Sequence, residues 1–306
     1  MKKVLKWIGI VLGILVGLVL LAALALYTKA RVQVNKTYDV QVEAVTIPTD
    51  PASIEHGKHL ATVLCMECHG DDLGGVPSWG VIPNMAVIST PNLTSGTGGA
   101  GAEFSEADWV RVLRHGVIPE GRSVFLMPSN NFYYLGDQDL GDLLAYVKSV
   151  PPVDKEIPDP HASFTFLGGV MYGAGLFGDL LRAGTIDQVN RPADFPEPGV
   201  TPEYGNYLVD INGCRSCHGA QMAGGKPSDP ASPLAPNLTR GGELIGWKEA
   251  DFIHTLRTGI ALSGHKLDPR FMPWTYKSKM TDEELQAIWA YLESLPPLPT
   301  STGPAE

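Results

Sequence analysis

Two short stretches of this chain combine residue types that bind metals or cofactors. Cys-x-x-Cys-His-Gly occurs at 65–70 and again at 214–219, and the four cysteines of these motifs are the only ones among the 306 residues. A Cys-x-x-Cys pair can form a redox disulfide, supply half of a zinc site or, when a histidine follows directly, attach a haem. In the haem interpretation both thiols form thioethers, and the adjacent imidazole is held against the iron as its proximal ligand.

Haem attachment accounts for every residue of both motifs. A thioredoxin-like site is disfavoured because no βαβ pattern surrounds either motif, and a zinc site built from both pairs leaves the two histidines unexplained. We therefore expect two c-type haems and no catalytic residue. The predicted attachment residues are Cys65, Cys68, Cys214 and Cys217, and the predicted proximal ligands are His69 and His218.

The motifs belong to a repeat that fills most of the chain. PNLT stands at 91–94 and 236–239, ADWVRVLRHGV at 107–117 matches ADFIHTLRTGI at 250–260, and DQDLGDLLAYVKSVPP at 137–152 matches DEELQAIWAYLESLPP at 282–297. Each copy predicts a short helix with the cysteines, a turn-rich stretch, a middle helix, a Gly/Pro loop and a final amphipathic helix. Asp137 and Asp282 are the predicted N-caps of the final helices. We expect an all-α fold with two tandem domains, 51–152 and 200–298.

The same alignment predicts a second axial ligand for each iron. Met127 and Met272 each precede a proline, and each lies 36 residues beyond the proline of its own PNLT sequence. No other methionine pair is matched in this way, and Met222 is too close to His218 to reach the opposite haem face. The alternative is that both methionines fill gaps in the core. A thioether favours ferrous iron, so His/Met ligation would give a closed haem of raised potential that carries electrons.

The first half contains CMECHG, PNLT and MPS, and the second half contains CRSCHG, PNLT and MPW. With these motifs the chain resembles a membrane-anchored dihaem cytochrome c. Each half is similar to a small class I cytochrome c domain. Similar arrangements occur in the multihaem cytochrome c subunits of membrane-bound alcohol and gluconate dehydrogenases, which usually carry three haems. The resemblance implies that the carbonyl of Pro91 accepts a hydrogen bond from His69, and that Pro236 does the same for His218, fixing each ring.

Two arginines could assist the haems. Arg114 and Arg257 hold the same position in both copies, so each is a candidate partner for a haem propionate, with an ordinary exposed helix arginine as the alternative. His59 aligns with Tyr207 of the second copy, so we expect it to be a packing or surface residue and not an iron ligand.

The charge distribution excludes one class of partner. Six of the 23 basic residues precede Asp39 with no acidic residue among them, which leaves 17 basic against 33 acidic residues, a net charge of −16 for residues 39–306. Such a body repels nucleic acid and favours a redox partner with a basic patch. The hydrophobic content of 44% argues against a disordered chain.

Residues 7–28 form an uncharged apolar run of 22 residues, long enough to cross a bilayer as a helix. A cleavable signal peptide is the alternative, but its apolar part would be only ~7 to 15 residues long. We expect residues 1–28 to be an uncleaved anchor and residues 29–50 an extended polar tether. Because the systems that this chain resembles attach c-type haems outside the cytoplasm, the resemblance implies a single-pass protein of the cytoplasmic membrane with periplasmic haem domains.

Two further segments complete the predicted organisation: an interdomain linker over 153–199 and a C-terminal tail over 299–306. The apolar part of 164–199 is too broken by glycine to form a second membrane span. We expect it to pack across the domain junction, with a partner-docking surface as the alternative.

These features together predict an electron-transfer protein and not an enzyme. It would relay single electrons between a membrane dehydrogenase or oxidase and another carrier, which could be soluble. The main alternative is a dihaem peroxidase, which needs one iron with an open coordination position. A haem-based sensor is a weaker alternative, because the sequence contains no recognisable output domain.

Overall fold

The computed structural model describes residues 2–158, 163–178, 180–191, 195–229 and 231–305. Parts of the predicted linker and the last residue of the predicted tail therefore lie outside the described residues. The first domain contains α2 (Pro51–Leu64), α3 (Met66–His69), β1 (Val76–Ile82), β2 (Ala86–Thr90), α4 (Ala100–Glu103), α5 (Glu106–His115), α6 (Ser129–Phe132) and α7 (Asp137–Ser149). The second contains α9 (Pro202–Ile211), α10 (Arg215–His218), α11 (Glu249–Thr258), α12 (Trp274–Lys277) and α13 (Asp282–Ser294). The described chain is thus mainly helical, as the sequence predicts.

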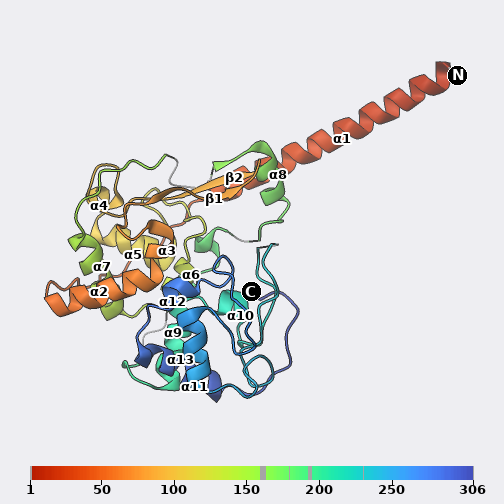
Figure 1. Cartoon of the computed structure of the whole chain (residues 1–306). Helices are drawn as coiled ribbons and strands as arrows, with labels where there is room; N and C mark the ends of the chain where they lie inside the picture. Colours follow the sequence, from red (N-terminus) through yellow and green to blue (C-terminus); the bar gives the residue numbers. More distant parts are fainter. Residues whose placement is uncertain (1, 159–162, 179, 192–194, 230, 306) are drawn as a thin grey trace.

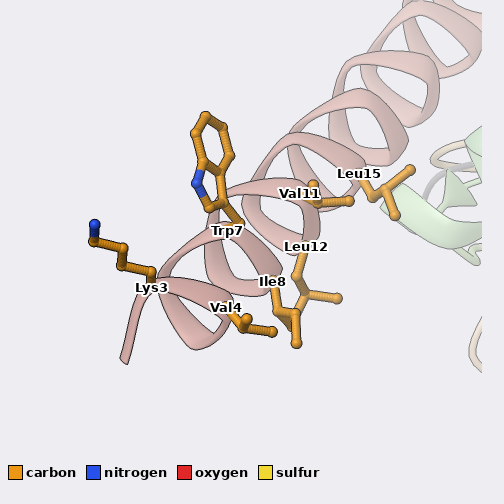
Figure 2. Close-up of a pocket in the computed structure, with 7 residues that line it drawn as sticks. All are labelled: Lys3, Val4, Trp7, Ile8, Val11, Leu12 and Leu15. Atoms are coloured by element: carbon orange, nitrogen blue, oxygen red, sulfur yellow. The ribbon is translucent and has the colours of Figure 1, made fainter. Parts of the chain in front are cut away.

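A long N-terminal helix, α1 (Lys2–Val34), projects away from the two domains (Figure 1). It is the one helix of the described chain that is long and apolar enough to cross a membrane, and none of its apolar window is buried in the protein. Figure 2 shows Trp7, Ile8 and Leu12 standing out from its first turns, with Lys3 at the end. These exposed apolar side chains suit a lipid environment, as a membrane anchor requires.

The helix continues past the predicted end of the anchor, and the segment after it is not a free tether. Residues 29–34 are the last turns of α1. The following residues lie on the first domain: Tyr38 N–H donates to the Gly121 carbonyl at 2.8 Å, and Val42, Val45 and Ile47 pack against its core. The prediction of a tether over 29–50 is therefore wrong, because residues 29–34 are helical and later apolar side chains pack against the first domain.

Both domains begin with the same helix start and the same helix crossing. Asp50 caps α2 and Thr201 caps α9, and a proline occupies the first turn of each helix. A glycine in each helix then faces the final helix of the domain. A Cβ on Gly57 would lie 1.8 Å from the Asp142 carbonyl oxygen, and one on Gly205 would lie 1.9 Å from that of Ala287. Only glycine permits these close α2–α7 and α9–α13 contacts.

The middle and final helices also match between the copies, although the predicted caps of the final helices are displaced. Asp137 and Asp282 are the first residues of α7 and α13, and the N-caps are Gly136 and Thr281. The prediction was wrong by one residue because aspartate also suits the first turn, where it faces the positive end of the helix dipole.

A small antiparallel sheet distinguishes the first domain. β1 pairs with β2 in the register Val81↔Val87, and β2 pairs with β3 (Ser163–Phe164) of the linker. The corresponding part of the second domain contains an isolated bridge between Gly225 and Ala235. The sequence predicts this stretch only as turn-rich.

The linker helix α8 (Phe166–Gly173) packs against α1, beside the tip of the β1–β2 hairpin (Figure 1). Farther along the segment 164–199, Phe195 packs at the domain junction as expected, 6.1 Å from the Tyr207 ring of α9 and against Gly136 of the first domain, whereas α8 does not reach the junction. Its two closely spaced glycines, Gly169 and Gly173, meet Tyr27 and Leu26 of α1. Backbones can approach this closely only where side chains are small.

The two domains share one hydrophobic core, and a pair of matched contacts links them. His59 of α2 lies 2.9 Å from the Glu284 carboxylate of α13, and the Tyr207 hydroxyl of α9 donates to Asp139 of α7. His59 and Tyr207 are equivalent positions of the repeat, as are Asp139 and Glu284. The domains therefore contact each other reciprocally, as subunits do across a twofold axis.

Candidate haem sites

Each Cys-x-x-Cys-His motif lies on a short helix that fixes its histidine. The His69 N–H donates to the Cys65 carbonyl at 3.0 Å, and His218 makes the same bond to Cys214 at 2.9 Å. This single turn holds the first cysteine and the histidine of each motif next to each other. All four side chains are at least partly buried.

The imidazoles are also held from the side. Nδ1 of His69 lies 2.9 Å from the Pro91 carbonyl oxygen, and Nδ1 of His218 lies 2.9 Å from that of Pro236. Nδ1 must donate to a carbonyl, so the other nitrogen, Nε2, keeps its lone pair. Burial lowers the pKa of both histidines, and the proline carbonyls only partly oppose it. Both rings are therefore neutral at neutral pH, the form that binds a metal ion.

The rest of the PNLT sequence explains how the proline carbonyl is positioned. The Asn92 amide donates to the Val153 carbonyl at 2.7 Å and accepts from the Thr94 N–H at 2.9 Å. In the second domain Asn237 donates to Leu298 at 2.8 Å and accepts from Thr239 at 2.8 Å. Each buried asparagine thus ties the loop behind the histidine to the segment that follows the final helix.

The two predicted methionine ligands occupy equivalent turns. Pro128 has φ −80° and ψ 52°, and Pro273 has φ −74° and ψ 51°. The Met127 carbonyl accepts from the Ser129 N–H at 2.8 Å, and that of Met272 accepts from the Trp274 N–H at 2.7 Å. Both methionines are only partly buried and lie at the edge of the core. The alignment is thus matched by the same backbone geometry at the two prolines.

Two of the unmatched methionines, Met222 and Met280, lie in the core. Met222 is 1% exposed and has a φ of 58°, and its counterpart Leu73 is 0% exposed with a φ of 55°. Met280 is 3% exposed, and its counterpart Leu135 is fully buried. These methionines take the place of leucine in the second copy, as gap-filling core residues do.

In the first domain the candidate side chains surround a cavity of about 530 Å³. Its wall includes Cys65, Cys68 and His69 on one part and Met127 on another, with Pro91 beside the histidine. Apolar side chains supply most of the remaining lining, among them Leu93, Phe104, Trp109, Leu113, Val124 and Phe132. Two thiols, an imidazole and a thioether around an apolar cavity form the donor set that a c-type haem requires, so the residues fit the group.

Two cations on this wall were not identified from the sequence. Arg182 of the linker helix η1 (Arg182–Gly184) lines the cavity, and its buried Nε has no hydrogen-bond partner among the described residues. Lys277 of α12 lines the cavity from the second domain. Its Nζ donates to the Val63 carbonyl at 3.0 Å and to Asn212 Oδ1 at 2.9 Å. Burial lowers the pKa of Lys277, although the nearby Cys214, Glu67, Cys65 and Cys68 oppose this effect.

The two predicted propionate partners, Arg114 and Arg257, form ion pairs within the protein. Arg114 is fully buried and forms ion pairs with Glu43 at 2.7 Å and with Asp137 at 2.6 Å. Arg257 pairs with Asp282 at 2.5 Å and donates to the Met280 carbonyl at 2.7 Å. Neither arginine lines the first cavity. The matched cations thus contact the start of each final helix, and their pairing with haem propionates stays a prediction.

The zinc alternative finds no support in the geometry. Within the described residues, no group of three or more histidine, cysteine, aspartate or glutamate side chains is arranged to hold a metal ion. Burial raises the pKa of Cys65 and Cys68 to about 12 and that of Cys214 to about 11.

Comparison with known proteins agrees with the geometry. Residues 54–151 match the family described as cytochrome c, and residues 202–292 match the family described as cytochrome C oxidase, cbb3-type, subunit III. The chain is 29% identical to an alcohol dehydrogenase (quinone) cytochrome c subunit of Gluconacetobacter polyoxogenes, over 85% of this chain and 59% of that protein. A fructose dehydrogenase cytochrome subunit of Gluconobacter japonicus is 26% identical, over 81% of this chain and 55% of the relative.

A further relative is similar in length to this chain. The diheme cytochrome c-type protein of Cereibacter sphaeroides is 28% identical, over 71% of each protein. By contrast, the chain spans only about 59% of the length of the alcohol dehydrogenase subunit that it matches. The two attachment motifs of this chain agree in number with the name of the Cereibacter protein, a diheme cytochrome.

Proposed function

We propose that this chain, in which residues 54–151 and 202–292 are cytochrome c domains, relays single electrons through two covalently bound haems with His/Met ligation. The observation that carries the proposal is that both domains build the same two fixed positions. Each holds an imidazole against a proline carbonyl and a methionine in a Met-Pro turn. A c-type haem, when bound, supplies an iron that alternates between the ferric and ferrous states.

The protein's own residues would attach and orient that group. Cys65 and Cys68 would form the thioethers of the first site, and Cys214 and Cys217 those of the second. Nε2 of each histidine would bind the iron, because the proline carbonyl already occupies Nδ1. The sulfur of Met127 or Met272 would fill the remaining axial position and exclude water and other small ligands.

Charge around the first site supports its role as an electron carrier. The Arg182 Nε is a buried donor without a described partner on the cavity wall, so we assign it to a haem propionate. Lys277 contributes a further cation from the second domain. Positive charge close to the iron favours the ferrous state, because reduction removes one positive charge from the centre.

The partners follow from the relatives and from the anchor. Proteins described as cytochrome subunits of alcohol and fructose dehydrogenases are similar to most of this chain. We therefore propose a membrane dehydrogenase as the electron donor, with an oxidase or a soluble carrier as the acceptor. The α1 helix would anchor the chain in the cytoplasmic membrane by a single span, with the haem domains on the periplasmic side.

Carbon monoxide binding tests the relay against the peroxidase, because only the peroxidase needs an open iron. The ferrous protein should bind almost no carbon monoxide, and the ferric protein should show the weak near-infrared band of Met-to-iron ligation. Met272→Leu preserves side-chain volume but removes the sulfur, so about half of the haem should then bind carbon monoxide. Met127→Leu should open the other half.

The structure supplies matched controls for these variants. Met222→Leu and Met280→Leu place leucine where the first copy already has buried Leu73 and Leu135, so neither should change carbon monoxide binding. Rapid carbon monoxide binding by the unmodified protein, accompanied by peroxide turnover, would replace the relay with the peroxidase. Binding caused equally by the control variants would remove Met127 and Met272 as ligands.

A further inference from the structure

The described linker residues 163–178 form an uncharged, exposed apolar segment on an acidic protein. They contain no aspartate, glutamate, lysine or arginine, whereas residues 39–306 as a whole carry 33 acidic and 17 basic residues. Within the segment, Phe166 is 55% exposed, Leu167 49% and Leu176 54%. Large apolar side chains gathered on one short segment mark a contact surface.

This segment is fixed to the end of the apolar run of α1. A Cβ on Gly173 would lie 2.0 Å from the Leu26 carbonyl oxygen, and one on Gly169 would lie 2.6 Å from the Tyr27 ring. The rings of Tyr27 and Phe166 are 5.1 Å apart. Two glycines at this spacing allow the helix backbones to pack directly, as they do between helices in membranes.

The opposite side of α8 is attached to the first domain. The Thr165 N–H donates to the Met85 carbonyl at 2.8 Å, and the Thr165 hydroxyl donates to the Asn84 carbonyl at 2.7 Å. A Cβ on Gly168 would lie 2.0 Å from the same Met85 oxygen. The helix is therefore held between α1 and the β1–β2 turn, where Figure 1 shows it at the base of α1.

The depth of α8 follows from its contacts on α1. Lys29 is the first charged residue after the apolar run. Tyr27 precedes it by two residues, about 3 Å along the helix axis at 1.5 Å per residue. Lipid headgroups and the upper acyl chains occupy a zone roughly 5 to 10 Å deep at this level. Phe166 and Leu167 therefore lie where the exposed surface of α1 passes from lipid to water, with Lys29 and Arg31 available to lipid phosphates.

We propose that α8 and the turn through Leu176 insert into the interfacial region of the phospholipid leaflet that α1 leaves at Lys29. The surface is continuous with the exposed apolar surface of α1, which is the reason to choose a bilayer as its occupant. This inference rests on α1 spanning a membrane and is independent of haem ligation. A second membrane contact beside the span fixes the tilt and rotation of the haem domains, which a single helix leaves free.

Spin labelling of the full chain in vesicles of phosphatidylcholine and phosphatidylglycerol tests this contact. Single cysteines are introduced by Leu167→Cys and, as a second position, Leu176→Cys. Val16→Cys in α1 reports the bilayer interior, and Leu262→Cys in the second domain is an aqueous reference with a native exposure of 56%, close to the 49% of Leu167. The unmodified chain is the labelling blank, because its four cysteines are assigned to the haems.

The readout is the ratio of nitroxide accessibility to oxygen, which partitions into lipid, and to a water-soluble nickel chelate. We expect the labels at 167 and 176 to give a ratio several-fold above that at 262 and below that at 16. A water-like ratio at 167 and 176 with a lipid-like ratio at 16 overturns the inference alone. A water-like ratio at 16 overturns the membrane span as well. Protection of 167 and 176 from both reagents assigns the surface to another protein and also overturns the inference.

Discussion

The contact between His59 and Glu284 makes the docking of the two domains dependent on pH. The imidazole Nε2 lies 2.9 Å from both carboxylate oxygens, and the side chains are only 24% and 10% exposed. The hydrogen bond to Glu284 raises the pKa of His59 against the opposing effect of burial. Burial opposes ionisation of Glu284, but the hydrogen bond and charge of His59, together with the hydrogen bonds from Thr281, lower the pKa of the carboxyl group.

The direction of the pH effect follows from these two shifts. A raised pKa in the folded protein means that the contribution of His59 is fully present below about pH 6.5, its unfolded value, and is lost as the pH rises through the folded value. The lowered pKa of Glu284 means that its contribution is lost only in acid, as the pH falls through that folded value. The pair therefore stabilises the docked domains most in mildly acidic solution.

Glu284→Gln tests this contribution with little other change. Glutamine keeps the size of the side chain and the ability to accept from the Thr281 N–H, a bond of 2.6 Å in the capping box at the start of α13. Exposed ion pairs contribute roughly 0.2–1 kcal/mol, and hydrogen bonds to charged groups roughly 1.5–3 kcal/mol. For this largely buried pair we expect a loss of about 1.5 kcal/mol near pH 6, or roughly tenfold in the unfolding equilibrium.

Urea unfolding of the full chain in detergent, followed by circular dichroism, measures the loss at about pH 6 and about pH 9. The cost of Glu284→Gln should be largest at the lower pH and shrink as the pH rises through the raised pKa of His59. Tyr207→Phe is the matched control, because it removes the equivalent contact to Asp139 through a hydroxyl that stays protonated in this range. Equal costs of Glu284→Gln at both pH values would refute the assignment of the effect to His59.

Two further predictions concern the cations on the wall of the first cavity. Lys277→Met should lower the reduction potential of one haem in an equilibrium redox titration, because it removes a positive charge from the cavity wall. The control Lys279→Met, at an exposed position, should leave both potentials unchanged. If Lys277→Met also left both potentials unchanged, the Lys277 amine would be uncharged there. Arg182→Gln should likewise lower the potential of the same haem. The control is Arg240→Gln, which removes the exposed partner of Glu293 and should not change the potential. An effect of Arg182→Gln on the other haem would contradict the assignment of Arg182 to the first cavity.

The repeat made the local structure of each domain predictable. Equivalent spacings placed Met127 and Met272 in turns of the same geometry, and the apolar periodicity of 137–152 and 282–297 gave α7 and α13 nearly at their observed bounds. Such features depend on residues close together in sequence, which a comparison of two copies reveals. The hydrogen bonds of Pro91 and Pro236 were expected from the resemblance alone, since nothing in the spacing identifies a carbonyl acceptor.

Contacts between distant segments were not predictable in this way. Lys277 has buried Phe132 as its counterpart, so the repeat marks it as a packing position, although its amine reaches the Val63 carbonyl of the other domain. The matched positions of Arg114 and Arg257 do not by themselves distinguish propionate pairing from a shared packing role. The close approach of Gly169 to Tyr27 joins residues that no local pattern relates.

The first candidate haem cavity is completed by the second domain, and this connects stability with function. Ile211, Asn212, Gly213, Pro273 and Lys277 all line it, although each belongs to the second repeat. Separation of the domains would therefore open one side of the cavity to water and remove a cation from its wall. His59 and Glu284 link the same two domains. The domain contact that closes the first cavity is therefore most stable in the pH range in which this pair is charged. On the proposed relay, the interface is then part of the electron-transfer apparatus, because it sets the solvent exposure and the electrostatic environment of one carrier while holding it beside the other.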